Sequence, residues 1–339
     1  MIKNRYLRVF GIIMLILGLA IVSAGCKSSS SGQNAGNTGN TGTVSDDSGN
    51  GNSDNGNSGS AAGSNSGNPG NGSAASGDNT GDASGGSDKC EITAFATGKA
   101  DALLVSAGNV NVLIDTGEET DAELICKRLR EKGIERLDLM IVTHFDRDHA
   151  GGVPAVMEQV SVDKVYYPDY ANTKDVYLAF RRAVGDTDGE GKITGITEFE
   201  AGDLKFVIYP EESPEKLRSK SNDFDNDMSL VSMLYYKGHK LLFAGDIEKE
   251  RITELLESSA DLSCEWIKMP HHGRYNKKLK ELLDSCTPSY AVITDSDEEV
   301  AATDTLVELQ KRKVQTYSIR KGEIVTTVSD EGIFVKYAE

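Results

Sequence analysis

The composition of the chain changes abruptly near Cys90, and this change limits which residues can fold. Residues 27–88 consist almost entirely of Gly, Ser, Asn, Asp, Thr and Ala, and they contain no aromatic residue. Such a segment buries too little apolar surface to offset its conformational entropy, so we expect a disordered tether over residues 26–89. Residues 90–339 are therefore expected to form the packed part of the chain.

The first 25 residues have the layout of a signal peptide. Lys3, Arg5 and Arg8 precede one apolar run, residues 9–22, which is shorter than the roughly 20 residues that span a membrane. The run ends in Ser23-Ala24-Gly25-Cys26, which resembles the lipobox of bacterial lipoproteins. The resemblance implies lipid on Cys26 and an extracytoplasmic chain anchored to the cell membrane. A conventional secretory signal with an incidental cysteine is the alternative.

The net charge of the chain is −17, with 36 Lys and Arg against 53 Asp and Glu. Binding to duplex nucleic acid is driven by Lys and Arg that displace counterions from phosphates, so we expect no stable duplex partner. Short single strands, nucleotides and other phosphodiesters remain open as ligands. Five cysteines are too few for a disulfide scaffold, although pairs among Cys90, Cys126, Cys264 and Cys286 could form outside the cytoplasm.

Strands and helices are predicted to alternate after Cys90, which indicates one α/β domain over residues 90–339. The predicted strands are residues 103–105, 110–115, 137–143, 230–236, 241–244, 264–269 and 290–294, and the predicted helices begin near residues 122, 151, 247 and 277. The acidic loop that begins at Asp186 resembles a calcium loop, but Thr197 stands where the twelfth-place Glu belongs. It is interpreted as a turn entering a hairpin, with a calcium site as the alternative.

The main chemical feature is the run His144-Phe145-Asp146-Arg147-Asp148-His149, directly after a predicted apolar strand. Alternate residues can point to one side, and carboxylate and imidazole groups together suit one or two divalent cations. A polar surface turn with capping aspartates is the alternative. Two histidines and two aspartates in six residues, with Gly151 and Gly152 beside them, favour the metal site.

Three other predicted strands end in acidic or imidazole residues. Asp115 follows one, Asp246 follows another, and His271 and His272 follow a third. Open α/β folds bind ligands at the carboxyl ends of their strands, so these side chains are expected to meet the first cluster. His239 falls in a predicted hairpin turn and is expected to be solvated.

The order Asp-Thr-Gly, His-x-Asp-x-Asp-His, Gly-Asp and His-His-Gly resembles the metallo-β-lactamase fold superfamily. Within it, the chain is most similar to the hydrolase domain of ComEC-like competence proteins, through residues 98–101 and 226–230. The resemblance covers residue 92 to about residue 309. It implies a four-layer αβ/βα sandwich that holds two divalent metal ions, Zn or Mn, with Fe as a further option.

The resemblance also implies roles for individual residues. The metal ligands would be His144, Asp146, Asp148, His149, Asp246 and His272, with Asp246 shared by both ions. Asp148, Asp246 and His271 would form the catalytic group, and Asp115, Asn226, Ser229 and Arg274 would support it. Asp146 stands where many members have a histidine, Arg274 replaces a serine, and a histidine usual before Gly245-Asp246 is missing.

These features predict a membrane-tethered, extracytoplasmic, binuclear metal-dependent hydrolase. Two cations would make a bridging water acidic enough to attack a phosphodiester such as single-stranded DNA, with Arg147 or Arg274 as candidate helpers. One alternative is a cell-envelope phosphodiesterase similar to phosphorylcholine esterases. Another is a non-catalytic binding lipoprotein that keeps the fold.

Overall fold

The computed structural model of the chain describes residues 88–185 and 191–339. Cys26, the 26–89 tether apart from its last two residues, and most of the acidic loop that begins at Asp186 lie outside the described residues. The predicted lipid anchor, the boundaries at residues 25 and 89 and the interpretation of that loop therefore stay predictions. In the part of the chain that the structure describes, no helix has both the length and the apolar character needed to cross a membrane.

Two β-sheets form the centre of the domain in the described residues. The first has the order β17-β16-β1-β2-β3-β5-β7-β8, and the second has the order β15-β14-β13-β12-β11-β10-β9. The strands of the first are β1 (Lys89–Ala94), β2 (Leu103–Ala107), β3 (Val110–Ile114), β5 (Leu139–Ile141), β7 (Val165–Pro168), β8 (Lys192–Ile193), β16 (Ile324–Ser329) and β17 (Gly332–Tyr337). The strands of the second are β9 (Thr197–Ala201), β10 (Leu204–Tyr209), β11 (Val231–Tyr236), β12 (His239–Phe243), β13 (Trp266–Lys268), β14 (Tyr290–Ile293) and β15 (Gln315–Ser318). A short pair, β4 (Arg136–Leu137) and β6 (Ser161–Val162), stands apart.

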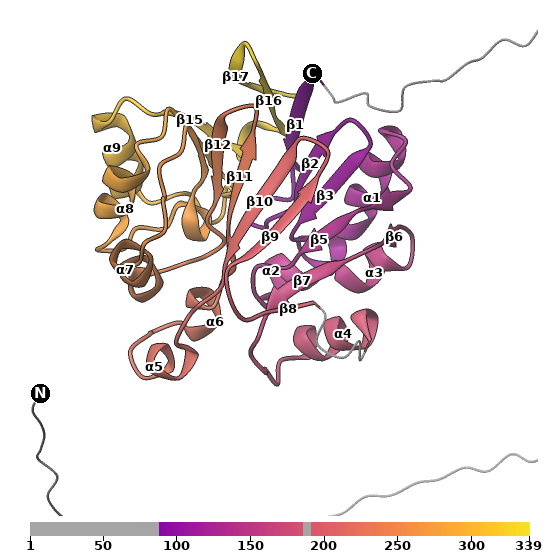
Figure 1. The fold of residues 1–339 in the computed structure, drawn as a ribbon, viewed down its shortest axis with the longest axis horizontal. Helices are drawn as coiled ribbons and strands as arrows, with labels where there is room; N and C mark the ends of the chain where they lie inside the picture. The colour runs from indigo at the N-terminus through magenta and orange to yellow at the C-terminus, as the bar shows by residue number, and fades with distance from the viewer. Residues whose placement is uncertain (1–87, 186–190) are drawn as a thin grey trace, which may run out of the picture. The chain divides into compact units, whose positions relative to one another are not determined.

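Helices cover the outer face of each sheet, so the domain has four layers (Figure 1). Helices α1 (Ala122–Glu131), α3 (Val153–Met157) and α4 (Asp175–Val184) lie on the first sheet, and α7 (Lys249–Glu257), α8 (Leu279–Cys286) and α9 (Thr303–Lys311) lie on the second. Short turns complete the fold: α2 (Arg147–Ala150), α5 (Pro214–Arg218), α6 (Phe224–Asp227), and the 3-10 turns η1 (Glu119–Asp121), η2 (Pro270–Gly273) and η3 (Ile319–Lys321). The predicted αβ/βα sandwich is confirmed.

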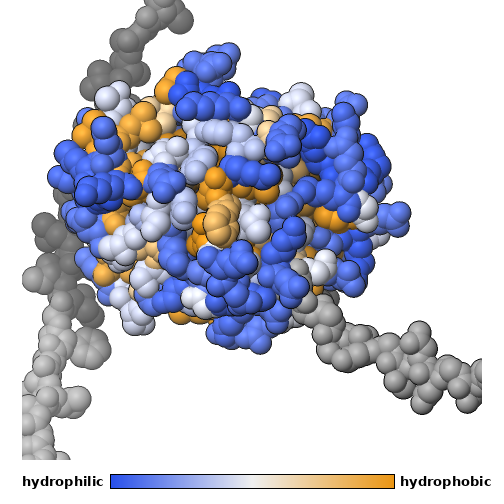
Figure 2. Space-filling view, turned by 90° about the horizontal axis from the view of Figure 1, so that it is seen from above, coloured by the Kyte–Doolittle hydropathy of each residue, from blue (hydrophilic) through white to orange (hydrophobic). Residues whose placement is uncertain are grey.

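Side chains alternate along the strands, and this alternation produces three apolar cores. Val105 and Ile114 point to the core between the sheets, where they meet residues of the second sheet such as Phe243. Their neighbours Leu104 and Leu113 pack under the helices of the first sheet. A third core lies between the second sheet and α7, α8 and α9. Apolar side chains reach the surface near the middle of the face in Figure 2, where hydrophilic residues surround them.

The strands that lead to the predicted site run parallel within each sheet. β3 pairs with β5 in the first sheet, and β12, β13 and β14 pair in sequence in the second. Their carboxyl ends therefore lie at one end of the sandwich, near α2 and α6 in the lower half of the domain in Figure 1. The backbone N–H of Leu230 donates to the carbonyl oxygen of Thr143 at 2.9 Å and joins the two halves there.

The cysteines of the described residues are free and buried. Cys264 and Cys286 are neighbours, because the backbone N–H of Cys264 donates to the carbonyl oxygen of Cys286 at 2.9 Å. Cys126 lies on the apolar face of α1 and packs into the core beneath this helix.

Candidate metal centre

The structure brings three of the predicted histidines together with two of the predicted aspartates. Nε2 of His272 lies 3.0 Å from Oδ2 of Asp246 and 3.3 Å from Oδ2 of Asp148. Nε2 of His149 lies 3.3 Å from the same oxygen of Asp246. The ring centroids of His144 and His149 are 4.1 Å apart. Segments that are far apart in the chain thus meet in one cluster.

The three ring nitrogens at the centre of this cluster lack hydrogen bonds. Nε2 of His144, His149 and His272 is buried in each case and makes no hydrogen bond in the structure. A buried nitrogen without a partner is destabilising, and several of them facing carboxylates form the donor set that binds a divalent cation. His144, His149 and Asp246 each offer one ligand atom within 4.8 Å of the others. The residues present therefore fit the divalent ions that the sequence resemblance implies.

The opposite nitrogen of each ring is held from behind. Nδ1 of His149 lies 2.8 Å from Oδ2 of Asp115, and Nδ1 of His272 donates to the carbonyl oxygen of Thr294 at 3.0 Å. Nδ1 of His144 lies 3.1 Å from the hydroxyl of Thr143 and 3.3 Å from that of Ser229. A proton held at Nδ1 leaves the Nε2 lone pair free to face a metal ion.

The aspartates of the cluster each contact one lysine. Lys99 Nζ lies 2.8 Å from Oδ2 of Asp148, and Lys174 Nζ lies 2.5 Å from Oδ1 of Asp146. Lys268 Nζ lies 3.3 Å from Oδ1 of Asp246. Burial disfavours the charged form of Asp148, but the nearby His272, His149 and Lys99 outweigh burial and lower the pKa of this carboxyl. Asp148 is therefore ionised at neutral pH, as metal binding requires.

Lys268 lies deeper than the other two lysines. Its side chain is 1% exposed, and its ammonium contacts Asp101 and donates to the carbonyl oxygen of Gly245 at 3.1 Å. Burial disfavours the charged ammonium, but the carboxylates of Asp101 and Asp246 outweigh burial and raise the pKa of Lys268. Lys268 is thus a fixed positive charge in the wall of the cluster.

The backbone at the strand ends adopts an unusual conformation. The φ angle is 56° at Asp115, 46° at His271 and 53° at His272, all in the left-handed region that side-chain-bearing residues seldom occupy. Gly245 has φ 55°, and a Cβ atom there would lie 2.8 Å from Cβ of Ser229. Conformations of this kind are concentrated at functional sites, because the surrounding structure must hold them in place.

The remaining predicted residues lie near the cluster or away from it. Oδ2 of Asp146 is 3.9 Å from Nε2 of His144, at the rim. Ser229 accepts a hydrogen bond from the backbone of Asp246 at 3.1 Å. The side chain of Asn226 lies 3.5 Å from Nε2 of His271. Nδ1 of His271 in turn lies 2.9 Å from Glu248.

Two predicted arginines do not join the cluster. Arg274 is exposed and pairs with Glu299 at 2.8 Å, and Arg147 is exposed and pairs with Glu118 at 3.3 Å. The sequence interpretation named both as candidate helpers of the chemistry. In the structure each forms a surface ion pair.

Sequence reasoning missed the partners behind the ligands, chiefly Asp101, Lys268 and Thr294. Asp101 gathers with Nδ1 of His149 and His272 as a second candidate metal group. Those nitrogens already face Asp115 and Thr294, and the ammonium of Lys268 contacts Asp101. The charge of Asp101 in this second group is therefore balanced by the lysine ammonium instead of a metal ion. The sequence offered one indication of these buried partners, the lysine that ends the otherwise apolar strand β13.

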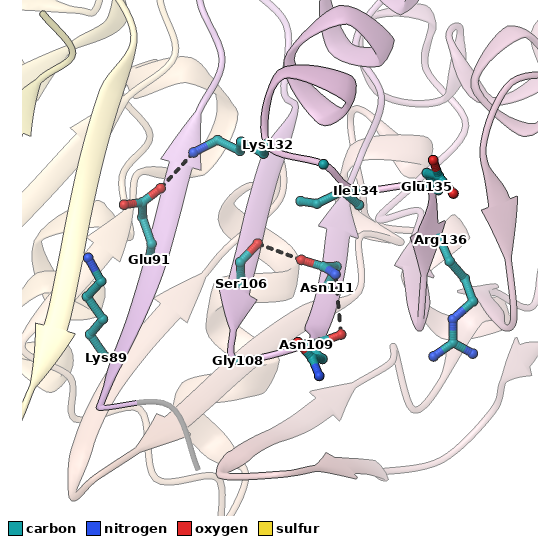
Figure 3. Close-up of a pocket in the computed structure, with 11 residues that line it drawn as sticks. Lys89, Glu91, Ser106, Gly108, Asn109, Asn111, Lys132, Ile134, Glu135 and Arg136 are labelled. Carbon is teal, nitrogen blue, oxygen red and sulfur yellow. Dashed lines mark hydrogen bonds and ion pairs between the residues drawn. The ribbon is translucent and has the colours of Figure 1, made fainter. Parts of the chain in front are cut away.

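A large hollow of about 560 Å³ lies elsewhere (Figure 3). It is lined by residues such as Lys89 at the start of β1, Ser106 on β2 and Asn111 on β3. Asp115 follows the opposite end of β3, so the hollow is not part of the histidine cluster. In the close-up, Glu91 pairs with Lys132 and Ser106 bonds to Asn111 across it.

Comparison with known proteins identifies relatives of the chain. It is 26% identical over 229 residues to ComE operon protein 3 of Bacillus subtilis (strain 168), covering 61% of this chain and 28% of that protein. It is 25% identical over 210 residues to competence protein ComA of Neisseria gonorrhoeae, covering 60% and 27%. The chain thus spans roughly a quarter of the length of the curated relatives it matches. The predicted similarity to ComEC-like competence proteins is confirmed.

Solved structures are also similar. The metallo-beta-lactamase fold protein YhfI from Bacillus subtilis has a TM-score of 0.46 at 11% identity, covering 68% of this chain and 96% of that one. Igni18, a metallo hydrolase from Ignicoccus hospitalis, has a TM-score of 0.43 at 15% identity, covering 74% and 100%. Residues 97–293 match the Metallo-beta-lactamase superfamily, whose members are generally metal-dependent hydrolases. This match covers more than half of the chain and includes every candidate ligand, and the chain therefore belongs to the metallo-beta-lactamase superfamily.

Proposed function

We propose that the chain is a metal-dependent phosphodiesterase, tethered to the membrane outside the cytoplasm, that cleaves single-stranded DNA or a related phosphodiester. The observation that carries the proposal is the convergence of three unpaired histidine nitrogens on Asp148 and Asp246. Two similar proteins bear the names competence protein and recombination protein 2. Competence and recombination are processes of DNA, so single-stranded DNA is the first substrate to test.

The residues divide into two ligand sets that share one aspartate. His144, Asp146 and Asp246 would hold one ion, and Asp148, His149, His272 and Asp246 would hold the other. Divalent ions bound there would make water more acidic and polarise a phosphoryl oxygen. The mixed ligand set would suit Zn or Mn, because carboxylates suit Mn and imidazoles suit Zn.

The protein supplies orientation and proton transfer around these ions. Asp115, Thr143 and Thr294 fix the rings of His149, His144 and His272. His271 lies beside the cluster, with its ring centroid 6.0 Å from that of His272. Its Nδ1 is held near Glu248, and its Nε2 faces the side chain of Asn226. From this position, Nε2 of His271 can contact the substrate and give a proton to the leaving oxygen.

Cleavage by the purified full-length chain tests the proposal. End-labelled single-stranded DNA and bis(p-nitrophenyl) phosphate are incubated with the chain and Mn²⁺ or Zn²⁺, and fragments or p-nitrophenol are measured. Activity should disappear in Asp148→Asn and persist in the control Asp330→Asn, a surface aspartate paired with Lys237. Hydrolysis of cell-wall polymers without DNA cleavage would favour the envelope phosphodiesterase. Metal binding without hydrolysis of any phosphodiester would favour the binding lipoprotein.

The tether is tested separately, because Cys26 lies outside the described residues. Lipid on Cys26 would keep the chain in the membrane fraction, and labelled fatty acid would be incorporated during growth. The Cys26→Ser variant should appear in the soluble extracytoplasmic fraction without label. A wild-type chain that is soluble and unlabelled would leave the conventional secretory signal as the correct interpretation.

A further inference from the structure

The lysines of the metal centre differ in burial. Lys268 is 1% exposed and lies between Asp101 and Asp246, where two buried carboxylates need a cation. The side chains of Lys99 and Lys174 are 23% and 49% exposed. An ion pair at that level of exposure contributes about 0–1 kcal/mol to stability, so folding alone does not explain the two rim lysines.

The two rim lysines approach the cluster from two different segments of the chain. Lys99 comes from the loop between β1 and β2, and Lys174 is the residue that precedes α4. Lys99 holds Asp148, whereas Lys174 bridges Asp146 and Asp225 at 2.5 and 2.6 Å. Asp146 and Asp148 are two positions apart in one turn, so the lysines flank that turn and both reach solvent.

The rim lysines add positive charge to that of the cluster itself. The cluster contains or borders five aspartates, Asp101, Asp115, Asp146, Asp148 and Asp246, and the whole chain carries a net charge of −17. The divalent ions proposed for the cluster, together with Lys268, would offset these carboxylates, and Lys99 and Lys174 would place further positive charge where an anionic substrate enters. An ammonium has three N–H donors. Lys99 uses one on Asp148 and Lys174 uses two on Asp146 and Asp225, which leaves donors on both for a ligand.

We propose that Lys99 and Lys174 form an anion subsite of the metal centre, in which their ammonium groups bind phosphoryl oxygens of the substrate. The inference rests on the proposed function and names the part of the substrate that the rim recognises. The opposing interpretation is that both lysines only neutralise the aspartates.

Binding of inorganic phosphate to the metal-loaded, full-length chain tests the subsite, with calorimetry as the readout. Lys99→Gln and Lys174→Gln should each raise the Kd for phosphate about tenfold, the value of one charge-assisted hydrogen bond. The control Lys205→Gln, which removes a lysine that pairs with Glu198 on the neighbouring strand, should leave the Kd unchanged. Lys99→Arg should restore phosphate binding, because it keeps the charge.

Metal content measured on the same samples separates the two interpretations. Unchanged phosphate affinity in both Gln variants overturns the inference, and so does a loss of phosphate binding that follows a loss of metal. Lysine-dependent phosphate binding without any phosphodiester cleavage upholds the subsite and refutes the proposed function. Cleavage with lysine-independent phosphate binding does the reverse.

Discussion

The Asp115→Asn substitution tests the idea that a carboxylate behind the cluster sets the orientation of a ligand. Asp115 is fully buried and accepts hydrogen bonds from the backbone N–H of Thr143 at 2.8 Å and from its hydroxyl at 2.7 Å. Its Oδ2 also lies 2.8 Å from Nδ1 of His149. Asn has the same size and tolerates the left-handed φ of 56° at this position, so the backbone should be retained.

The effect should appear in metal affinity. An amide in place of the carboxylate can keep the hydrogen bond from the Thr143 N–H through its oxygen. Its NH₂ group, however, cannot accept a hydrogen bond from the N–H at Nδ1 of His149. That ring then favours a proton on Nε2, the nitrogen that should face a metal ion. Loss of such an outer partner costs about 10–100-fold in metal affinity, or about 1.4–2.7 kcal/mol.

Competition against a chromophoric chelator measures this affinity for Mn²⁺ and Zn²⁺, and nitrogen NMR of labelled imidazoles reports which nitrogen of His149 carries the proton. Asp138→Asn is the matched control, because Asp138 also accepts a hydrogen bond from a backbone N–H, that of Asn111 at 2.8 Å. Asp138 lies between β4 and β5, outside the cluster. A folded Asp115→Asn chain that binds both metals as tightly as the wild type would refute the reasoning.

Three further predictions concern stability. Lys268→Met should destabilise the fold by about 3–5 kcal/mol in urea titrations, because Asp101 and Asp246 lose their buried partner, and Asp101→Asn added to it should recover part of the loss. Metal at 100 times its Kd should stabilise the chain by about 2.7 kcal/mol, and a chelator should reverse the rise in Tm. Burial and the adjacent Glu254 raise the pKa of Glu211 from 4.5 to about 7, although Arg251 opposes this rise. The native state therefore holds the Glu211 proton more tightly than the unfolded state does. The free energy of unfolding should fall by about 1–3 kcal/mol as the pH rises from 4.5 toward 7. Glu211→Gln should reduce this dependence on pH in denaturation curves recorded across the range.

The candidate ligand cluster was predictable because its residues follow apolar strands in short motifs. A buried strand that ends in Asp or His indicates a site even without knowledge of its neighbours, and Asp115, His144 and Asp246 each follow a predicted strand of this kind. Periodicity also identified the strands and helices that carry them. Strand-end motifs and residue periodicity describe neighbouring residues in the sequence, so they predicted individual strands, helices and strand ends.

The residues behind the ligands were not predictable in the same way. Thr294 donates to Asp101 across 193 positions of sequence, and nothing in either segment points to the other. Lys268 follows the apolar residues Trp266 and Ile267 in β13. From the sequence alone, its charge was equally consistent with a lysine at a solvent-exposed strand end. The pairing of β16 with β1 was not predicted either. Side-chain alternation indicates which faces of a strand are buried, but it does not indicate which strand lies alongside.

The division of the cluster between the two halves of the chain has a consequence for folding. Asp115, His144, Asp148 and His149 belong to the first half of the sandwich, and Asp246 and His272 belong to the second. Neither half alone holds the complete set, so tight binding of a metal ion by these residues would require the halves to have docked. Metal uptake by the proposed centre is thus expected late on the folding route, and ion release during unfolding would report the moment at which the two sheets separate.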